Sequence, residues 1–262
     1  MKERSLGTAL VTGASSGIGA TYADRLARRG YDLILVARDQ PRLEAIAGRL
    51  RGETGVNIEV IRGDLTVAED LRRLEERLRT DSRVGLLVNN AGAAAPGGFA
   101  DPDLDAQETL IRLNVTAVTR LTGAIAPRLL AAGGGSIINI ASVLALAPEV
   151  MPGIYAATKA FVLTFSQSLQ TELGPRGLYV QAVLPSATRT EIWARSGRDV
   201  DTIPGVMDVG ELVDAALLGF DRHELVTIPS LPDVRQWESF ATARQAMVPN
   251  FRQKHAAARY QT

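Results

Sequence analysis

Cysteine is absent from this 262-residue chain, histidine occurs only twice, and the net charge is zero. The lack of cysteine excludes disulfides, thiolate nucleophiles and Cys-ligated metals, and it fits a reducing compartment. His223 and His255 lie far apart in sequence and have no carboxylate cluster at metal-ligand spacing, so we expect no metal site. Because basic and acidic residues are equal at 29 each, no net field favours binding to nucleic acid or to an anionic membrane.

The chain also lacks internal repeats, low-complexity tracts and a Pro/Ser-rich linker, so we expect one domain over residues 1–262. The charged start reaches Thr12-Gly13 without a hydrophobic signal segment, which favours a cytoplasmic location. Two regions fit no regular pattern: a loop over about 186–208 and a C-terminal extension over about 229–262. We expect the aromatic residues of the extension to pack onto the domain or against another subunit.

Short apolar runs alternate with segments of helical length. Runs such as Leu33–Val36 are apolar on both faces, as required in a parallel sheet that is covered by helices on each side. The pattern predicts an α/β fold, a doubly wound and mainly seven-stranded parallel sheet in a three-layer sandwich. The expected strands are Leu6–Thr12, Asp32–Ala37, Asn57–Ile61, Val84–Asn89, Ser136–Ile140, Tyr179–Leu184 and Leu225–Ile228. The expected helices are Ala20–Arg29, Pro41–Arg51, Ala68–Thr80, Ala106–Ala132, Ile154–Leu173 and Val209–Phe220.

A glycine-rich turn follows the first expected strand. A strand-to-helix turn can approach a pyrophosphate closely only where side chains are missing, which leaves backbone N–H groups and the positive helix end facing the phosphates. This turn therefore predicts a dinucleotide site. Its candidate binding residues are Gly13, Ser15, Ser16, Gly17, Ile18 and Gly19.

A second motif places a phenol and an ammonium one turn apart on a helix, at Tyr155 and Lys159, with Ser142 at the end of the fifth strand. Ser142 lacks the G-x-S-x-G pattern of a hydrolase nucleophile. A phenol beside a cation is suited to proton transfer. Together with the glycine turn, these residues favour hydride transfer accompanied by proton transfer.

These motifs resemble, in order and spacing, those of the short-chain dehydrogenase/reductase family over about the first 190 residues. Asn89-Asn90-Ala91-Gly92 and Asn114 complete the similarity. The resemblance implies a Rossmann-type fold and an oxidoreductase. One departure follows the sixth strand, where the family usually has Pro-Gly-x-x-x-Thr and this chain has Pro185-Ser186-Ala187-Thr188-Arg189-Thr190. Serine in place of glycine puts the local turn geometry in question.

By this resemblance, Tyr155 is the general acid/base, Ser142 donates a hydrogen bond to the substrate oxygen, and Asn114 anchors a water behind Lys159. Lys159 also holds the ribose hydroxyls. A shift of the phenol pKa by two or three units requires about 3–4 kcal/mol from the ammonium and the oxidised nicotinamide together. The remaining expected cofactor contacts are Asn90, Ala91, Gly92, Pro185, Thr188 and Thr190, whereas Asn89 is expected to brace the central strands.

The second strand ends in Ala37-Arg38-Asp39, which bears on the choice of cofactor. By the same resemblance, Ala37 occupies the place of the acid that selects NAD. The Arg38 guanidinium that follows can bind a 2′-phosphate, so we expect NADP(H) to be preferred. The alternative is that Asp39 selects the cofactor and Arg38 is a solvated charge. Asp64-Leu65 resembles the family's adenine-binding pair, so we favour adenine contact; the alternative is that Asp64 is a generic strand-end cap.

The expected pocket wall is mainly apolar, formed by Val143–Pro148, Met151–Ile154 and Trp193. It favours a hydrophobic ketone, aldehyde or alcohol as substrate. Arg189, Arg195 and Arg198 leave a 3-oxoacyl-thioester reductase open, and Glu149 or Glu191 can touch substrate or remain solvated.

The rival from another class is a non-catalytic NADP(H)-binding sensor on the same fold. The expected partners are a small-molecule substrate and a second copy of the chain, in a homodimer or homotetramer that pairs the long helices.

Overall fold

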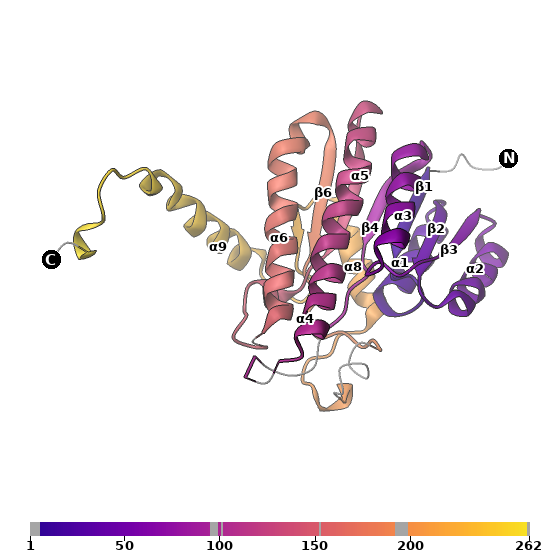
Figure 1. The fold of residues 1–262 in the computed structure, drawn as a ribbon, viewed down its shortest axis with the longest axis horizontal. Helices are drawn as coiled ribbons and strands as arrows, with labels where there is room; N and C mark the ends of the chain where they lie inside the picture. The colour runs from indigo at the N-terminus through magenta and orange to yellow at the C-terminus, as the bar shows by residue number, and fades with distance from the viewer. Residues whose placement is uncertain (1–5, 95–98, 101, 152, 192–198, 261–262) are drawn as a thin grey trace. The chain divides into compact units, whose positions relative to one another are not determined.

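A computed structural model describes residues 6–94, 99–100, 102–151, 153–191 and 199–260. Seven parallel strands form a sheet in the order β3-β2-β1-β4-β5-β6-β7 (Figure 1). The order reverses at β1, which lies between β2 and β4, so the predicted doubly wound sheet is confirmed. The strands are β1 (Thr8–Thr12), β2 (Asp32–Ala37), β3 (Ile58–Arg62), β4 (Val84–Asn89), β5 (Gly135–Ile140), β6 (Leu178–Val183) and β7 (Val226–Thr227).

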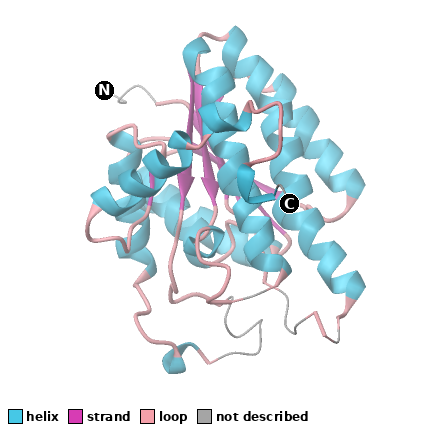
Figure 2. Cartoon of the chain, turned by 90° about the vertical axis from the view of Figure 1, so that its left-hand side faces the viewer, coloured by secondary structure: helices cyan, strands magenta, loops and turns pink. Residues whose placement is uncertain are grey.

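Helices cover both faces of the sheet, and Figure 2 shows the strands enclosed between them. One face shares a hydrophobic core with α1 (Gly17–Arg28), α2 (Gln40–Thr54) and α8 (Val209–Asp221). The other face packs mainly against α3 (Ala68–Thr80) and α5 (Val118–Ala131). Helix α6 (Ile154–Leu173) contributes to that second core and to a smaller cluster beside β6. These layers are the predicted three-layer sandwich.

The second strand shows why an uninterrupted apolar run is needed. Leu33 and Leu35 belong to the core under α1 and α2, whereas Ile34 and Val36 belong to the core under α3 and α5. All four side chains are buried. Successive side chains of a strand point to opposite faces, so a sheet that is covered on both sides needs apolar residues at every position.

The expected long helix over 106–132 is interrupted. Helix α4 (Leu104–Ile111) leads into a π-helical segment, Arg112–Ala117, before α5 begins. A π-helical segment adds a residue to the turn and often occurs at functional sites. Here it carries Asn114. The sequence pattern did not reveal it, because helices flank the segment on both sides and the whole stretch has helical character.

The chain divides into two compact units, Met1–Ser230 and Leu231–Thr262. The second unit contains α9 (Val234–Ala246), a helix that the sequence pattern did not predict. None of its described residues is buried in the single chain. Its ring pair is Trp237 and Phe240, with centroids 5.7 Å apart. Among the described residues, no helix has both the length and the apolar character needed to cross a membrane.

Close packing joins the turn after β1 to the end of β4. A Cβ atom on Gly13 would lie 2.8 Å from Asn90 Nδ2 and 2.9 Å from Ala91 Cα. A Cβ on Gly19 would collide with the Gly13 carbonyl oxygen and with Asn90 Nδ2. The glycines therefore allow α1 and the end of β4 to approach each other at the point where the strand order reverses.

We predict that Gly19→Ala destabilises the protein by about 1–3 kcal/mol, because the methyl group has to displace backbone atoms. The matched control is Gly48→Ala in α2, where nothing lies within 4 Å of the added Cβ. That change should stabilise the helix by about 0.5–1 kcal/mol. Urea denaturation of both variants measures the difference, and equal midpoints would contradict the packing argument.

Candidate active site

The predicted dinucleotide motif lies at the carboxyl end of β1, beside the reversal of strand order. Gly13 and Gly17 have φ values of +66° and +52°, the left-handed region that glycine adopts without strain. Ser16 is the N-cap of α1, but its side chain makes no capping hydrogen bond. The N–H groups in the first turn of α1 are therefore not capped by Ser16 and remain suited to binding an anion.

Two asparagines after β4 brace this region. Asn89 Nδ2 donates to Asn139 Oδ1 at 2.9 Å and to Thr122 Oγ1 at 3.1 Å, which confirms the predicted bracing of the central strands. Asn90 Nδ2 donates to the Thr12 carbonyl at 2.9 Å, and its backbone N–H donates to Thr12 Oγ1 at 3.0 Å. The side chain of Asn90 thus locks the glycine turn onto β4.

At the end of β2, Arg38 extends into solvent with 71% of its side chain exposed, and its Nη1 lies 3.8 Å from Asp64 Oδ2. The carboxylate of Asp39 caps α2 instead, accepting the Arg42 N–H at 3.1 Å. Arg38 is therefore the more available of these two charged groups for a ligand.

Asp64 and Leu65 both have structural contacts. Asp64 Oδ1 accepts hydrogen bonds from Thr66 N at 2.9 Å and from Thr66 Oγ1 at 2.7 Å. Leu65 is buried in the core under α3 and α5. Asp64 thus forms the strand-end cap that the sequence left as an alternative to adenine contact.

Ser142, Tyr155 and Lys159 converge at the carboxyl end of β5. Lys159 is buried, and its Nζ donates to the Ile140 carbonyl at 2.8 Å and lies 5.7 Å from the centre of the Tyr155 ring. Ser142 is buried, and its Oγ donates to the Pro185 carbonyl at 3.4 Å and accepts the Leu144 N–H at 3.2 Å. Its hydroxyl is near enough to the Tyr155 phenol to act on the pKa of that group. A strand end and one helix, α6, therefore bring together a hydroxyl, a phenol and an ammonium.

Burial controls the pKa values of this group. It raises the pKa of Tyr155 to about 12, against the opposing effect of the hydrogen bond with Ser142. It also lowers the pKa of Lys159 to about 8. A nearby ammonium is expected to lower the pKa of the phenol. The protein's own groups raise this pKa instead, because desolvation is the larger effect. The phenol is protonated at neutral pH.

Asn114 links the π-helical segment to α6. Its Oδ1 accepts the Ala93 N–H at 3.1 Å, and its Nδ2 donates to the Ala93 carbonyl at 3.0 Å and to Thr158 Oγ1 at 3.1 Å. Thr158 in turn donates to the Tyr155 carbonyl at 2.7 Å. A Cβ on Gly92 would lie 3.3 Å from Asn114 Oδ1 and 3.4 Å from Lys159 Nζ, so these three residues meet.

Ser186, which follows β6 where the family usually has glycine, causes no backbone strain. Among the described residues other than glycine, only His223 has a positive φ, so Ser186 does not need the conformation that favours glycine. The Pro185 carbonyl accepts the Val143 N–H at 2.9 Å, joining this turn to the loop after β5. A Cβ on Gly17 would lie 3.1 Å from Thr190 Cγ2, and Thr188 is buried. The segment therefore lies against the glycine turn.

Part of the expected pocket wall packs inward. Val143, Ala145 and Leu146 contact the hydrophobic cluster of β6 and α6. Arg189 and Glu191 are engaged in ion pairs, with Asp201 and Arg42 respectively, and Glu149 is exposed. Pro152, Trp193, Arg195 and Arg198 lie outside the described residues.

Sequence reasoning missed two residues of the site. Thr158 connects Asn114 to the helix that carries Tyr155, and Arg42 binds the loop after β6. Thr158 lies inside the motif Tyr155-x-x-x-Lys159, so its polarity within a buried helix was a usable signal. Arg42 offered none, because its partner is distant in sequence.

Comparisons with known proteins agree with this geometry. Residues 7–201 match the short chain dehydrogenase family. A short-chain dehydrogenase from Sphingobium yanoikuyae, solved in complex with NADPH, is 58% identical, covers 98% of this chain and 100% of its own, and has a TM-score of 0.96. The bulky-bulky ketone specific alcohol dehydrogenase from Comamonas testosteroni is 54% identical, with coverage of 99% and 100% and a TM-score of 0.92.

Among curated proteins, very-long-chain 3-oxoacyl-CoA reductase-A from Danio rerio is 38% identical over 188 residues, or 70% of this chain. The matched part spans 59% of the length of that relative. The family match over residues 7–201 agrees with the glycine turn after β1 and with the cluster of Ser142, Tyr155 and Lys159 at β5 and α6. The chain therefore belongs to the short-chain dehydrogenase/reductase family.

Proposed function

We propose that this protein is an NADP(H)-dependent oxidoreductase that interconverts a hydrophobic ketone or aldehyde and an alcohol. The observation that carries the proposal is the convergence of Ser142, Tyr155 and Lys159 at the sheet edge that also carries the glycine turn. A cytoplasmic location belongs to the same proposal and is supported by the absence of cysteine.

The residues around β1 and β2 fit a dinucleotide phosphate. Gly13 and Gly19 leave no room for a side chain at the turn, Ser16 makes no cap, and Arg38 reaches into solvent. In the proposed complex, the first turn of α1 holds the pyrophosphate and Arg38 binds the 2′-phosphate. The other proposed contacts are Ser15, Ile18, Asp64, Leu65, Asn90, Ala91 and Gly92, with Pro185, Thr188 and Thr190. NADPH in the solved structure of the Sphingobium relative supports this assignment.

The nicotinamide cofactor supplies the hydride, and the protein has to supply the proton. Tyr155 is our proposed acid, since its phenol is protonated at neutral pH. Ser142 lies near that phenol and can donate to the substrate oxygen as negative charge develops there. Lys159 places positive charge beside the phenol and is proposed to hold the ribose hydroxyls. Asn114 is proposed to anchor a water behind Lys159, and it also binds Thr158 of the helix that carries Tyr155 and Lys159.

The substrate class has two candidates. The Comamonas relative is specific for bulky-bulky ketones, which supports a large apolar ketone. The Danio relative is a 3-oxoacyl-CoA reductase, which supports an acyl thioester. Arg189 is paired with Asp201 at 2.7 Å, so this arginine is already engaged and contributes less to anion binding. We therefore favour the bulky ketone.

We predict that Tyr155→Phe loses at least about a hundredfold in kcat for ketone reduction, because general acid catalysis contributes about 10²–10⁴-fold. NADPH and NADH binding, followed by cofactor fluorescence, should be unchanged, with NADPH bound more tightly. A panel of bulky diaryl ketones, small ketones and 3-oxoacyl-CoA esters then identifies the substrate class. Wild-type protein that binds NADPH without turning over any of them would support the sensor reading instead.

We also predict a pH dependence. Burial lowers the pKa of Lys159 to about 8, so its ammonium is present below that pH and is lost as pH rises through it. The kcat/KM for NADPH should therefore fall above about pH 8, because this parameter reports the enzyme before the cofactor binds. Circular dichroism at each pH controls for unfolding. A profile that stays flat to about pH 10, the usual pKa of lysine, would contradict the assignment.

The proposed oligomer involves the C-terminal unit. A 13-residue helix is marginal in water without tertiary contacts, and α9 has no buried residue in the single chain. Residues 231–262 contain five basic and two acidic side chains, a net charge of +3, whereas the rest of this neutral chain carries −3. Opposite charges and exposed Phe240, Met247 and Phe251 support binding of this unit to a second copy of the chain.

We predict that a chain ending at Ser230 has a lower oligomeric state than the full chain, measured by light scattering after size exclusion. Because the first unit keeps all its strands, the truncated protein should still melt cooperatively. A full-length monomer, or an unchanged oligomer after truncation, would rule out this role for the C-terminal unit.

A further inference from the structure

An ion pair fastens the loop after β6 to the nucleotide-binding half of the protein. Arg42 Nη1 lies 2.7 Å and 2.8 Å from the two carboxylate oxygens of Glu191. The two residues are 149 positions apart in sequence, and about half of each side chain is exposed. Arg42 belongs to the first turn of α2, and Glu191 follows Thr190 in the loop.

This ion pair joins the segment after β2 to the segment after β6, beside the turn that follows β1. On one side, Thr190 lies against Gly17 of the glycine turn. On the other side, α2 starts directly after Arg38, and the turn itself is tied to β2 by a 3.2 Å hydrogen bond from Ala14 N to the Val36 carbonyl. The pair thus connects two segments that the proposed function assigns to cofactor binding, the end of β2 and residues 185–190.

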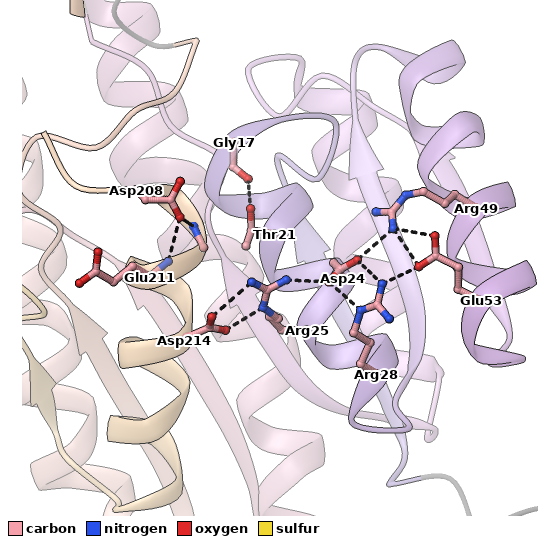
Figure 3. Close-up of polar contacts among 11 residues, drawn as sticks. Gly17, Thr21, Asp24, Arg25, Arg28, Arg49, Glu53, Asp208, Glu211 and Asp214 are labelled. Carbon is pink, nitrogen blue, oxygen red and sulfur yellow. Dashed lines mark hydrogen bonds and ion pairs between the residues drawn. The ribbon is translucent and has the colours of Figure 1, made fainter. Parts of the chain in front are cut away.

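The far end of the loop is fastened to the same half. Helix α8, which follows the loop, carries Asp214, and Arg25 of α1 donates to its two oxygens at 2.7 Å and 3.2 Å (Figure 3). Asp208 caps α8 by accepting the N–H groups of Gly210 and Glu211. The contacts between α1 and α8 hold the end of the loop, whereas Glu191 joins the start of the loop to α2.

The two arms of the loop also pair with each other. Arg189 N donates to the Met207 carbonyl at 3.0 Å, and Met207 N donates to the Ala187 carbonyl at 2.9 Å. A force that moves residues 189–191 away from α2 therefore has to break these backbone hydrogen bonds or shift the far arm. The position of Thr188 and Thr190 is coupled to the Glu191 ion pair through this bridge.

We propose that Arg42 and Glu191 are positioning residues whose ion pair holds residues 187–191 against the glycine turn and so sets the affinity for the nicotinamide cofactor. This inference rests on the proposed function. The pair acts through the loop and not on the 2′-phosphate, so it supports NADPH and NADH equally. Loss of an exposed ion pair of this kind is expected to raise the dissociation constant of either cofactor by about two- to fivefold.

The test uses the full-length variants Glu191→Gln, Arg42→Gln, the double variant, and the charge exchange Arg42→Glu with Glu191→Arg. A matched control is Glu59→Gln, which breaks the ion pair of Glu59 with Arg77, a 2.8 Å hydrogen bond between β3 and α3. The readouts are the dissociation constants of NADPH and NADH, from cofactor fluorescence, and hydrogen exchange at the Arg189 and Met207 amides.

We expect both single variants to weaken binding of both cofactors by about two- to fivefold and to speed exchange at the two amides by a similar factor. The double variant should match the single ones, the charge exchange should restore binding, and Glu59→Gln should behave as wild type. The proposal would be overturned if Arg42→Gln weakened the binding of NADPH but not of NADH, while Glu191→Gln bound both cofactors as the wild type does. That result would make Arg42 a phosphate ligand. Additive losses in the double variant would also overturn it. If the wild type binds neither cofactor, the proposed function fails, while amide exchange still tests the fastening of the loop.

Discussion

The close approach of backbone at the reversal of strand order is the constraint on which the site depends. Gly13 and Gly19 let the turn after β1 lie against the end of β4, where Asn90 hydrogen-bonds to it. This contact aligns the first turn of α1 with the end of the sheet, and it leaves the amide groups of that turn free of side-chain caps. The polar chemistry of the site is then built outward from an arrangement in which glycine leaves room for the Asn90 amide to join the two segments.

A chain of polar contacts transmits this placement to the reacting group. Asn89 joins β4 to β5 through Asn139, and Asn139 donates to Ser166 of α6 at 2.9 Å. Asn114 holds the same helix near its start through Thr158. Buried amides and hydroxyls are costly unless they are hydrogen-bonded, so these partners define one register for α6 against the sheet. Tyr155 and Lys159 take their positions from that register.

Much of the fold and the core of the candidate site could be predicted from local sequence. Apolar runs such as Leu33–Val36 located the strands, and the spacing of Tyr155 and Lys159 identified the helical pair. The π-helical segment around Asn114 was not predicted, because helix flanks it on both sides and no residue type within it marks the change in backbone hydrogen bonding. The upward shift of the Tyr155 pKa was missed, since burial depends on tertiary packing. The pairing of Arg42 with Glu191 joins distant segments and has no local signal.

The anchoring of α6 at two heights has a consequence for insertions and deletions. Tyr155 and Lys159 lie in its first turns, and Ser166 fixes the helix farther along. One residue added between Lys159 and Ser166 would rotate one part of the helix relative to the other by about 100°. Either the reacting pair or the buried hydroxyl would then face the wrong way. The length of this stretch is therefore constrained as strictly as its composition.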